Sequence, residues 1–130
     1  ILLMNINLDT IILFVQNVEQ LKVFYTDIFK LEVLEDYAPE WVLLKAGNGK
    51  IGLHKIGEQY LDKNKAAFKV DSNCKMVFEI EEDIHQLRER LLQQNVLIRE
   101  IKTFDNYEYL LCDGEDPQGN VFQLKKKVMN

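Results

Sequence analysis

The chain states the same order of secondary-structure elements twice, and this duplication constrains its fold more than any other sequence feature. The first half opens with the apolar run Thr10–Val15 and closes with Gly49–Leu53. The second half opens with Lys75–Ile80 and closes with Gly119–Leu124 in the same manner. Two copies of one module predict two similar units, with a functional site expected between them.

Each half is predicted to run strand, helix and then three strands. In the first half, apolar residues from Val18 to Phe29 fall on one helical stripe, and Asn17 is a suitable N-cap. The Gly47-Asn48-Gly49 segment predicts a hairpin turn. Strands of this half are expected over residues 10–15, 31–37, 41–46 and 50–56.

In the second half, a helix is predicted over residues 82–94, with Ile84, Leu87 and Leu91 on its inner face. The segment 113–120 is dense in turn residues, so its three acidic side chains are expected to form turns rather than a carboxylate site. Strands are expected over residues 75–80, 96–104, 107–112 and 120–126.

The predicted organisation is a single domain over residues 1–130. It contains a first module over residues 8–56, a linker over 57–73 and a second module over 74–127. Met4 is a candidate start of the natural protein, which would leave residues 1–3 outside it.

The composition is that of an ordinary globular protein, with 47% hydrophobic and 28% charged residues. A net charge of −5 argues against non-specific binding of nucleic acid. No apolar run reaches the roughly 18–20 residues that a membrane-spanning helix needs. The two cysteines, Cys74 and Cys112, lack a CxxC spacing. We therefore expect a cytoplasmic protein with no nucleic acid or membrane partner.

Two tandem βαβββ units make the chain similar to the vicinal oxygen chelate superfamily. This group includes glyoxalase I, fosfomycin-resistance enzymes, bleomycin-resistance proteins and extradiol dioxygenases. The likeness rests on Val18–Tyr25 followed by Asp27–Leu31, and on Asp116-Pro-Gln-Gly-Asn120 before the last strand. It covers residues 8–126 and implies an α+β fold in which tandem βαβββ modules form a curved mixed sheet around a cleft.

The resemblance also implies a divalent metal, held by His, Gln or Glu side chains on the first and last strands of the two modules. The matching positions in this chain are Thr10, Gly52, Lys75 and Gln123. A hydroxyl is a poor ligand, glycine has no side chain, and an ammonium group repels a cation. We therefore expect neither the family's metal nor another cofactor.

A shifted metal site is the alternative that the alternation of side chains leaves open. His54 and Glu79 are the two ligand types that share the cleft-facing parity of their strands. Glu79 lies about 13 Å along its strand from Lys75, and no third ligand accompanies the pair. The same two residues are the candidates for acid–base catalysis, and a solvated or hydrogen-bonded structural role is the competing interpretation for both.

Six residues are candidates for binding a ligand. Lys75 is expected to anchor an anionic group, unless it pairs with a neighbour within the chain. The aromatic candidates are expected to line an apolar site, unless they belong to the core. The full set of binding candidates is Lys75, Gln123, Thr10, Phe14, Trp41 and Tyr109.

Three functions are consistent with these residues. The first is a metal-independent protein that holds a small organic ligand, anionic or aromatic, in the cleft, as bleomycin-resistance-type proteins do. The second is a lyase or isomerase of glyoxalase type, either metal-dependent with a shifted site or metal-free through Glu79 or His54. The third is an interaction protein with a vestigial cleft. A homodimer is expected because open sheets leave edges that a partner covers.

Overall fold

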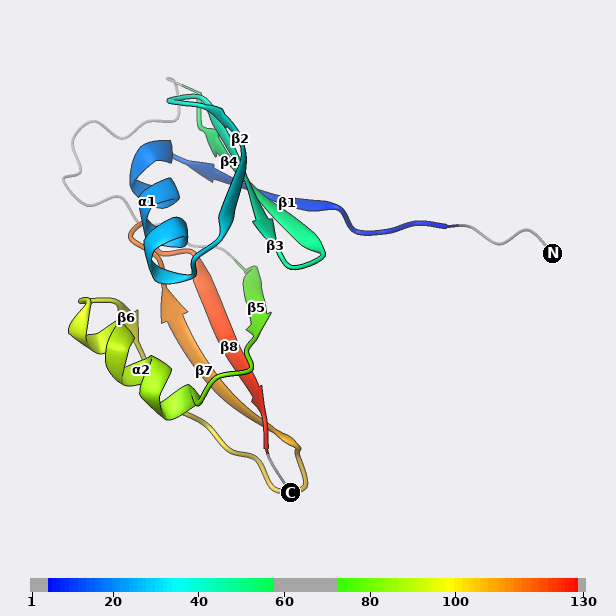
Figure 1. Ribbon diagram of the computed structural model, residues 1–130, viewed down its shortest axis with the longest axis vertical. Coiled ribbons are helices and arrows are strands. Elements are labelled where there is room, and N and C mark those ends of the chain that lie inside the picture. Colours follow the sequence, from blue (N-terminus) through cyan, green and yellow to red (C-terminus); the bar gives the residue numbers. More distant parts are fainter. Residues whose placement is uncertain (1–4, 58–72, 129–130) are drawn as a thin grey trace. The chain divides into compact units, whose positions relative to one another are not determined.

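The computed structural model describes residues 5–57 and 73–128 of the chain. The chain divides into two compact units, Ile1–Lys65 and Ala66–Asn130 (Figure 1). The predicted linker lies almost entirely outside the described residues, as do residues 1–3.

Unit 1 is a four-stranded mixed sheet with one helix. Strands β1 and β4 are parallel, and the pairs β4–β3 and β3–β2 are antiparallel, so the strand order is β1-β4-β3-β2. The elements of unit 1 are β1 (Thr10–Val15), α1 (Val18–Ile28), β2 (Glu32–Tyr37), β3 (Trp41–Ala46) and β4 (Gly49–Lys55).

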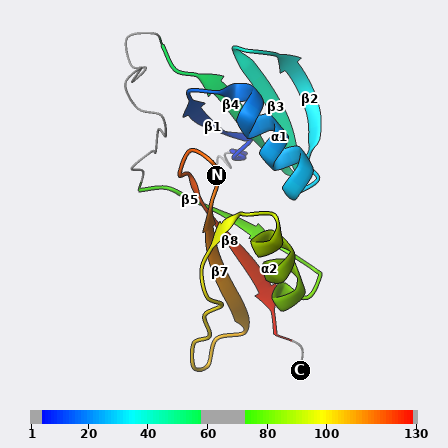
Figure 2. The same cartoon turned by 90° about the vertical axis from the view of Figure 1, so that its left-hand side faces the viewer.

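Helix α1 begins where the sequence predicts, because Asn17 caps it. The Asn17 side chain accepts a hydrogen bond from the Gln20 backbone N–H at 3.0 Å. The apolar stripe of α1 lies against β3 and β4, and α1 covers one face of the sheet (Figure 2). The buried residues of this unit are Val15, Val18, Leu21, Phe24, Tyr25, Val42, Leu44, Ile51 and Leu53.

A β-bulge in β2 decides which side chains of this strand face α1. The register between β2 and β3 shifts between Val33 and Glu35, so that Val33 pairs with Leu44 while Glu35 pairs with Leu43. Val33 therefore shares the face of buried Leu44, and Glu35 lies on the opposite face. Strict alternation would have put both on one face. The next residue, Asp36, then lies on the helix side.

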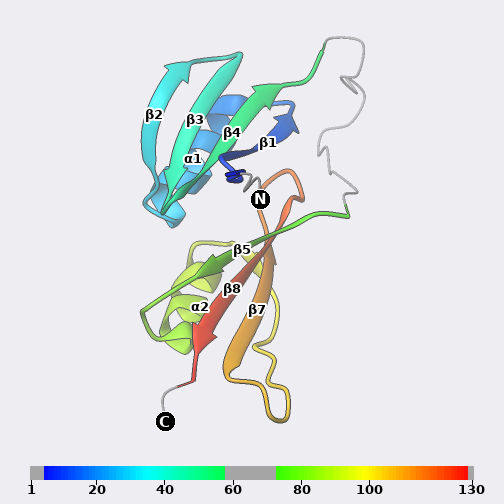
Figure 3. The ribbon, with the colours of Figure 1, turned by 90° about the vertical axis from the view of Figure 1, so that its right-hand side faces the viewer.

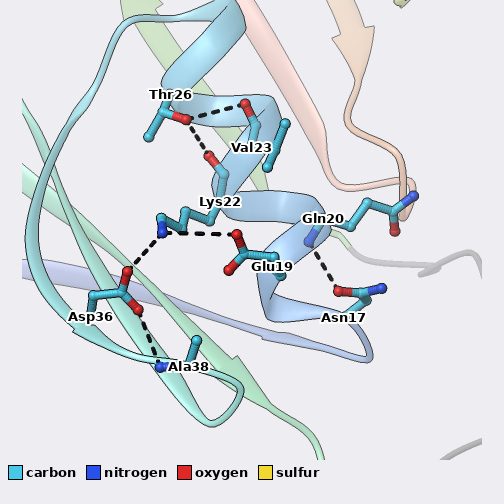
Figure 4. A network of polar contacts seen from close by, with 8 residues as sticks. All are labelled: Asn17, Glu19, Gln20, Lys22, Val23, Thr26, Asp36 and Ala38. Carbon is cyan, nitrogen blue, oxygen red and sulfur yellow. Dashed lines mark hydrogen bonds and ion pairs between the residues drawn. The ribbon is translucent and has the colours of Figure 1, made fainter.

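Asp36 uses that position to join β2 to α1 (Figure 4). Its Oδ2 atom lies 2.7 Å from Lys22 Nζ, and its Oδ1 accepts from the Ala38 backbone N–H at 3.2 Å. Lys22 also lies 3.8 Å from Glu19 Oε1. The Lys22 hydrogen bond lowers the pKa of Asp36, which favours the charged form of this link. The network fixes the turn between β2 and β3 against the helix.

Unit 2 repeats the architecture of unit 1. Its strand order is β5-β8-β7-β6, with β5 and β8 parallel and the other pairs antiparallel. Asp83 caps α2 by accepting from the backbone N–H groups of His85 and Gln86. The elements of unit 2 are β5 (Lys75–Glu79), α2 (Ile84–Gln93), β6 (Leu97–Ile98), β7 (Tyr109–Glu115) and β8 (Val121–Lys127).

The core of unit 2 lies between α2 and its sheet. Its buried residues are Met76, Ile84, Leu87, Leu91, Val96, Ile98, Cys112, Phe122 and Leu124. Of the helices that the described residues form, none has the length and apolar character needed to cross a bilayer.

The strand predicted over residues 96–104 is wrong for most of its length. Only Leu97–Ile98 pairs regularly with β7, and Lys102 adds one isolated bridge to Leu111. Side chains explain the interruption: the Arg99 carbonyl accepts from Arg88 Nε at 2.8 Å and from the Cys112 thiol at 3.2 Å. These donors occupy an acceptor that a continued strand ladder would use.

The assignment of residues 113–115 to a turn is also wrong, since β7 continues to Glu115. Asp113 pairs in register with Gln123, and Glu115 pairs with Val121. Turn chemistry appears only at Asp116, which is buried and accepts from the backbone N–H groups of Gln118 and Asn120.

Candidate functional site

Among the described residues of unit 1, no helix covers the face of the sheet opposite α1, and the side chains on that face are mostly apolar. In Figure 3 the strands of this unit lie in front of α1. The register aligns Ile12 with Gly52 and Phe14 with His54, and Trp41 lies opposite His54 on the other side. Ile12 is 46% exposed and Phe14 is 61% exposed. We call this the open face of unit 1, made of Ile12, Phe14, Glu35, Tyr37, Trp41, Leu43, Gly52 and His54.

The outer edge of the six-membered ring of Trp41 lies over the backbone of Gly52 on the open face. A Cβ atom at residue 52 would lie 2.4 Å from Trp41 Cη2 and 2.9 Å from its Cζ3, so only glycine leaves room for the ring. The indole Nε1–H donates to Glu35 Oε1 at 2.8 Å. The indole is therefore held at two places, by its contact with Gly52 and by its hydrogen bond to Glu35.

His54 stands next to this indole with a defined hydrogen-bonding pattern. Its ring centroid lies 5.3 Å from that of Phe14 and 6.0 Å from that of Trp41. His54 Nδ1 lies 2.8 Å from the carbonyl oxygen of Lys55. Because a carbonyl only accepts, we assign the hydrogen to Nδ1, which leaves Nε2 of the neutral ring as an acceptor. The open face thus combines three aromatic rings with a fixed imidazole acceptor.

The sheet of unit 2 carries a polar cluster around Asp113. Its Oδ2 lies 2.8 Å from Lys75 Nζ, and its Oδ1 accepts from Gln123 Nε2 at 3.0 Å. The Asp113 side chain is only 12% exposed, against 44% for Lys75. Burial by itself raises the pKa of Asp113, but the hydrogen bonds from Lys75 and Gln123 outweigh it and hold the pKa below its usual range.

The remaining candidates lie outside these two clusters. The Thr10 hydroxyl donates to Asp9 Oδ2 at 2.6 Å. Tyr109 has Lys125 Nζ 4.1 Å above its ring centroid, and the Tyr107 ring lies 5.6 Å away. Glu79 is exposed and pairs in register with Lys125. Of the predicted site residues, the structure therefore brings together Phe14, Trp41 and His54 in unit 1, and Lys75 and Gln123 in unit 2.

Two residues of these clusters were missed in the sequence. Glu35 reaches the open face through the bulge, and no local signal marks that shift. Asp113 was assigned to a turn because the segment 113–120 is dense in turn residues. In the structure it lies in β7, directly opposite Gln123 of β8.

The four positions that the resemblance reserves for a metal do not fit a divalent cation. The Thr10 hydroxyl is bonded to Asp9, and the Trp41 ring covers Gly52. The Lys75 ammonium and the Gln123 amide N–H both point their hydrogens at Asp113. Within residues 5–57 and 73–128, no three His, Cys, Asp or Glu side chains gather as a metal site requires.

Solved structures identify the fold. Lactoylglutathione lyase from Agrobacterium tumefaciens superposes with a TM-score of 0.73 at 17% identity, covering 92% of each chain. The fosfomycin resistance protein FosX from Listeria monocytogenes gives a TM-score of 0.71 at 14% identity, covering 98% of this chain and 97% of that one. This chain has the vicinal oxygen chelate fold. The predicted α+β class and the two βαβββ modules are thereby confirmed.

An integron cassette protein from V. cholerae also superposes on this chain, with a TM-score of 0.72 at 21% identity, covering 97% of this chain and 98% of that one. No family model matches the sequence, and no curated protein matches it either. Because this fold supports unrelated chemistries, the function has to be argued from the side chains.

Proposed function

We propose that this chain is a metal-independent small-molecule-binding protein whose open face of unit 1 holds an aromatic organic ligand. The observation that carries the proposal is the Trp41 indole, which covers Gly52 and donates to Glu35, with the His54 ring beside it and the Phe14 ring against His54. A ring already fixed in place offers a stacking surface without the entropy cost of ordering it on binding. Aromatic pairs contribute roughly 0.5–1.5 kcal/mol beyond the area they bury.

Metal independence is supported by the side chains at the four family positions. The Thr10 hydroxyl is bonded to Asp9, Gly52 has no side chain and is covered by Trp41, and Lys75 is a cation bonded to Asp113. Binding therefore rests on stacking and hydrogen bonds in this proposal.

The test uses Trp41, the only tryptophan of the chain, as an internal reporter. A screen of aromatic metabolites should yield compounds that change the Trp41 emission and raise the melting temperature. Trp41→Leu should abolish the thermal shift. Metal analysis of the purified protein provides the opposing result: stoichiometric Ni²⁺, Zn²⁺ or Mn²⁺ that is lost in His54→Ala would refute the proposal.

One observation favours a second function, metal-free proton transfer in a lyase or isomerase. The bond from His54 Nδ1 to the Lys55 carbonyl fixes the tautomer whose Nε2 can take a proton from a bound molecule. Glu79, the other candidate base, is exposed and has no comparable orienting contact among the described residues. If a compound that binds the open face is also converted, His54→Gln should stop turnover while binding persists.

We further propose that the protein is a cytoplasmic homodimer. The apolar residues Ile6 and Leu8, 76% and 79% exposed, precede β1 and offer surface for a second copy. Analytical ultracentrifugation of the wild type and of Ile6→Asp/Leu8→Asp tests this assembly: the wild type should sediment as a dimer and the variant as a monomer. An interaction protein without ligand would show the dimer but no hit in the aromatic screen.

A further inference from the structure

On the open face, the ring N–H donors of Trp41 and His54 already have hydrogen-bond acceptors within the chain. Trp41 Nε1–H is bonded to Glu35, and His54 Nδ1–H is bonded to the Lys55 carbonyl. A ligand on this face therefore finds no free ring N–H from either residue. The Tyr37 hydroxyl, on an exposed side chain, can act as donor or acceptor.

The acceptors of the same face remain available. Within residues 5–57 and 73–128, His54 Nε2 has no hydrogen-bond partner, and His54 is exposed. Glu35 gives one oxygen to the indole, and its Oε2 has no partner among the described residues. Both acceptors flank the same indole, one through ring contact and one at the Nε1 edge.

The charge near the indole is negative. Glu35 is a carboxylate, whereas Lys45 and Lys50 lie beyond the open face, opposite each other in the strand register at the far end of β3 and β4. Lys45 is four residues from Trp41 along an extended strand, about 13 Å away. Lys50 is also engaged by Asp9 at 2.7 Å. A cation over the indole is attracted by the Glu35 carboxylate and by the π-face of the ring, whereas an anion is attracted by neither.

Resting on the proposed function, we infer that the ligand of the open face is a planar aromatic cation bearing N–H donors, of the amidinium class. Its ring stacks on Trp41, one N–H donates to Glu35 Oε2, and another donates to His54 Nε2. In unit 2, Lys75 was expected to anchor an anion, but its ammonium is bonded to the nearly buried Asp113. An anionic ligand therefore competes there with an internal carboxylate.

The experiment compares three probes that share one ring and differ in the head group: benzamidine, benzamide and benzoate. The single tryptophan gives one indole N–H signal in a ¹H–¹⁵N correlation spectrum of the full chain. Benzamidine should shift this signal with a dissociation constant at least about fivefold lower than that of benzoate. Glu35→Gln keeps an acceptor for the indole and removes the charge, and should weaken benzamidine binding by about threefold to tenfold.

Matched controls separate charge near the indole from charge elsewhere. Glu32→Gln makes the same change at the other end of β2, where Glu32 pairs with Lys45, and should leave benzamidine binding unchanged. His54→Phe keeps an aromatic ring and removes the acceptor, so it should weaken benzamidine binding, while His85→Phe on α2 should not.

Two outcomes would overturn the inference in different ways. If benzoate binds as tightly as benzamidine, or if Glu35→Gln behaves like Glu32→Gln, the cation preference is wrong although the open face still binds aromatic compounds. If no probe and no compound of the aromatic screen shifts the indole signal, the proposed function itself fails, and this inference fails with it.

Discussion

Replacing Gly52 by alanine should dislodge Trp41 and so remove the stacking surface. The added methyl group would lie 2.4 Å from Trp41 Cη2, 2.9 Å from Cζ3 and 3.2 Å from Cζ2. These distances are far inside the roughly 3.5–4.0 Å at which carbon atoms pack. Because the indole is rigid, the whole ring has to tilt away from β4, which stretches or breaks its 2.8 Å bond to Glu35.

The free energy of unfolding should fall by about 1–3 kcal/mol, the usual cost of inserting a methyl group into a packed contact. We expect the lower half of this range, because the ring is partly exposed and can swing toward solvent. Urea denaturation followed by far-UV circular dichroism measures the change. The Trp41 emission should move to longer wavelength as the ring becomes solvated, and aromatic ligands should bind at least about tenfold more weakly.

Gly49→Ala is the matched control on the same strand. A Cβ atom there meets only the Ala46 carbonyl oxygen at 3.8 Å, an ordinary contact. The double variant Trp41→Leu/Gly52→Ala removes the clashing ring, so alanine at residue 52 should cost much less in that background. The reasoning would be refuted if Gly52→Ala matched Gly49→Ala in stability, emission and ligand affinity, since the ring would then not rest on residue 52.

Three further predictions concern other contacts. The depressed pKa of Asp113 means that its charged form stabilises the folded state above the unfolded-state pKa near 3.8, and that this contribution is lost as pH falls through the lower folded-state pKa. In Asp113→Asn, the free energy of unfolding from urea titrations should therefore fall less steeply as the pH is lowered. An unchanged pH dependence at acid pH would contradict the pairing with Lys75. Burial raises the pKa of the Cys112 thiol, whereas Cys74 is exposed. A thiol reagent at neutral pH should therefore label Cys74 in the native protein and Cys112 only after denaturation. Equal labelling rates of the two cysteines in the native protein would argue against the burial of Cys112. Asn17→Ala removes the N-cap of α1 and should lower the free energy of unfolding by about 1 kcal/mol, with Asn17→Asp as the conservative control that retains it.

Local signals were sufficient for most elements of the fold. The apolar run Thr10–Val15 became β1 without a change of boundary, and Asn17 starts α1 as its side chain requires. Alternation along the strands also gave His54 its cleft-facing parity, because side chains of a strand alternate between its two sides. Trp41 was predicted only as an aromatic binding candidate, and the pairing of β3 with β4 brings it next to His54. Each of these predictions depends on residues close together in the sequence.

The sequence failed where a distant partner decides the outcome. Asp113 precedes a glycine and reads as a turn, but Lys75, 38 positions earlier, and Gln123 supply the hydrogen bonds that keep it in β7. The strand expected after Val96 ends early because side chains of α2 and β7 bind the Arg99 carbonyl. Such contacts depend on which elements the fold brings together, and periodicity does not contain that information.

By itself, the sequence therefore determined the duplicated βαβββ order, the Asn17 cap of α1, the apolar faces and the mismatch of Thr10, Gly52 and Lys75 with a metal site, since residue type and spacing are enough for each. Only the tertiary structure decided how the candidate site is built. The bulge before Glu35 turns its carboxylate toward the indole, and the pairing of β3 with β4 brings Trp41 over Gly52, where no side chain obstructs the ring. Both features arise from pairing between strands, where a shift of one residue exchanges the two faces of a strand.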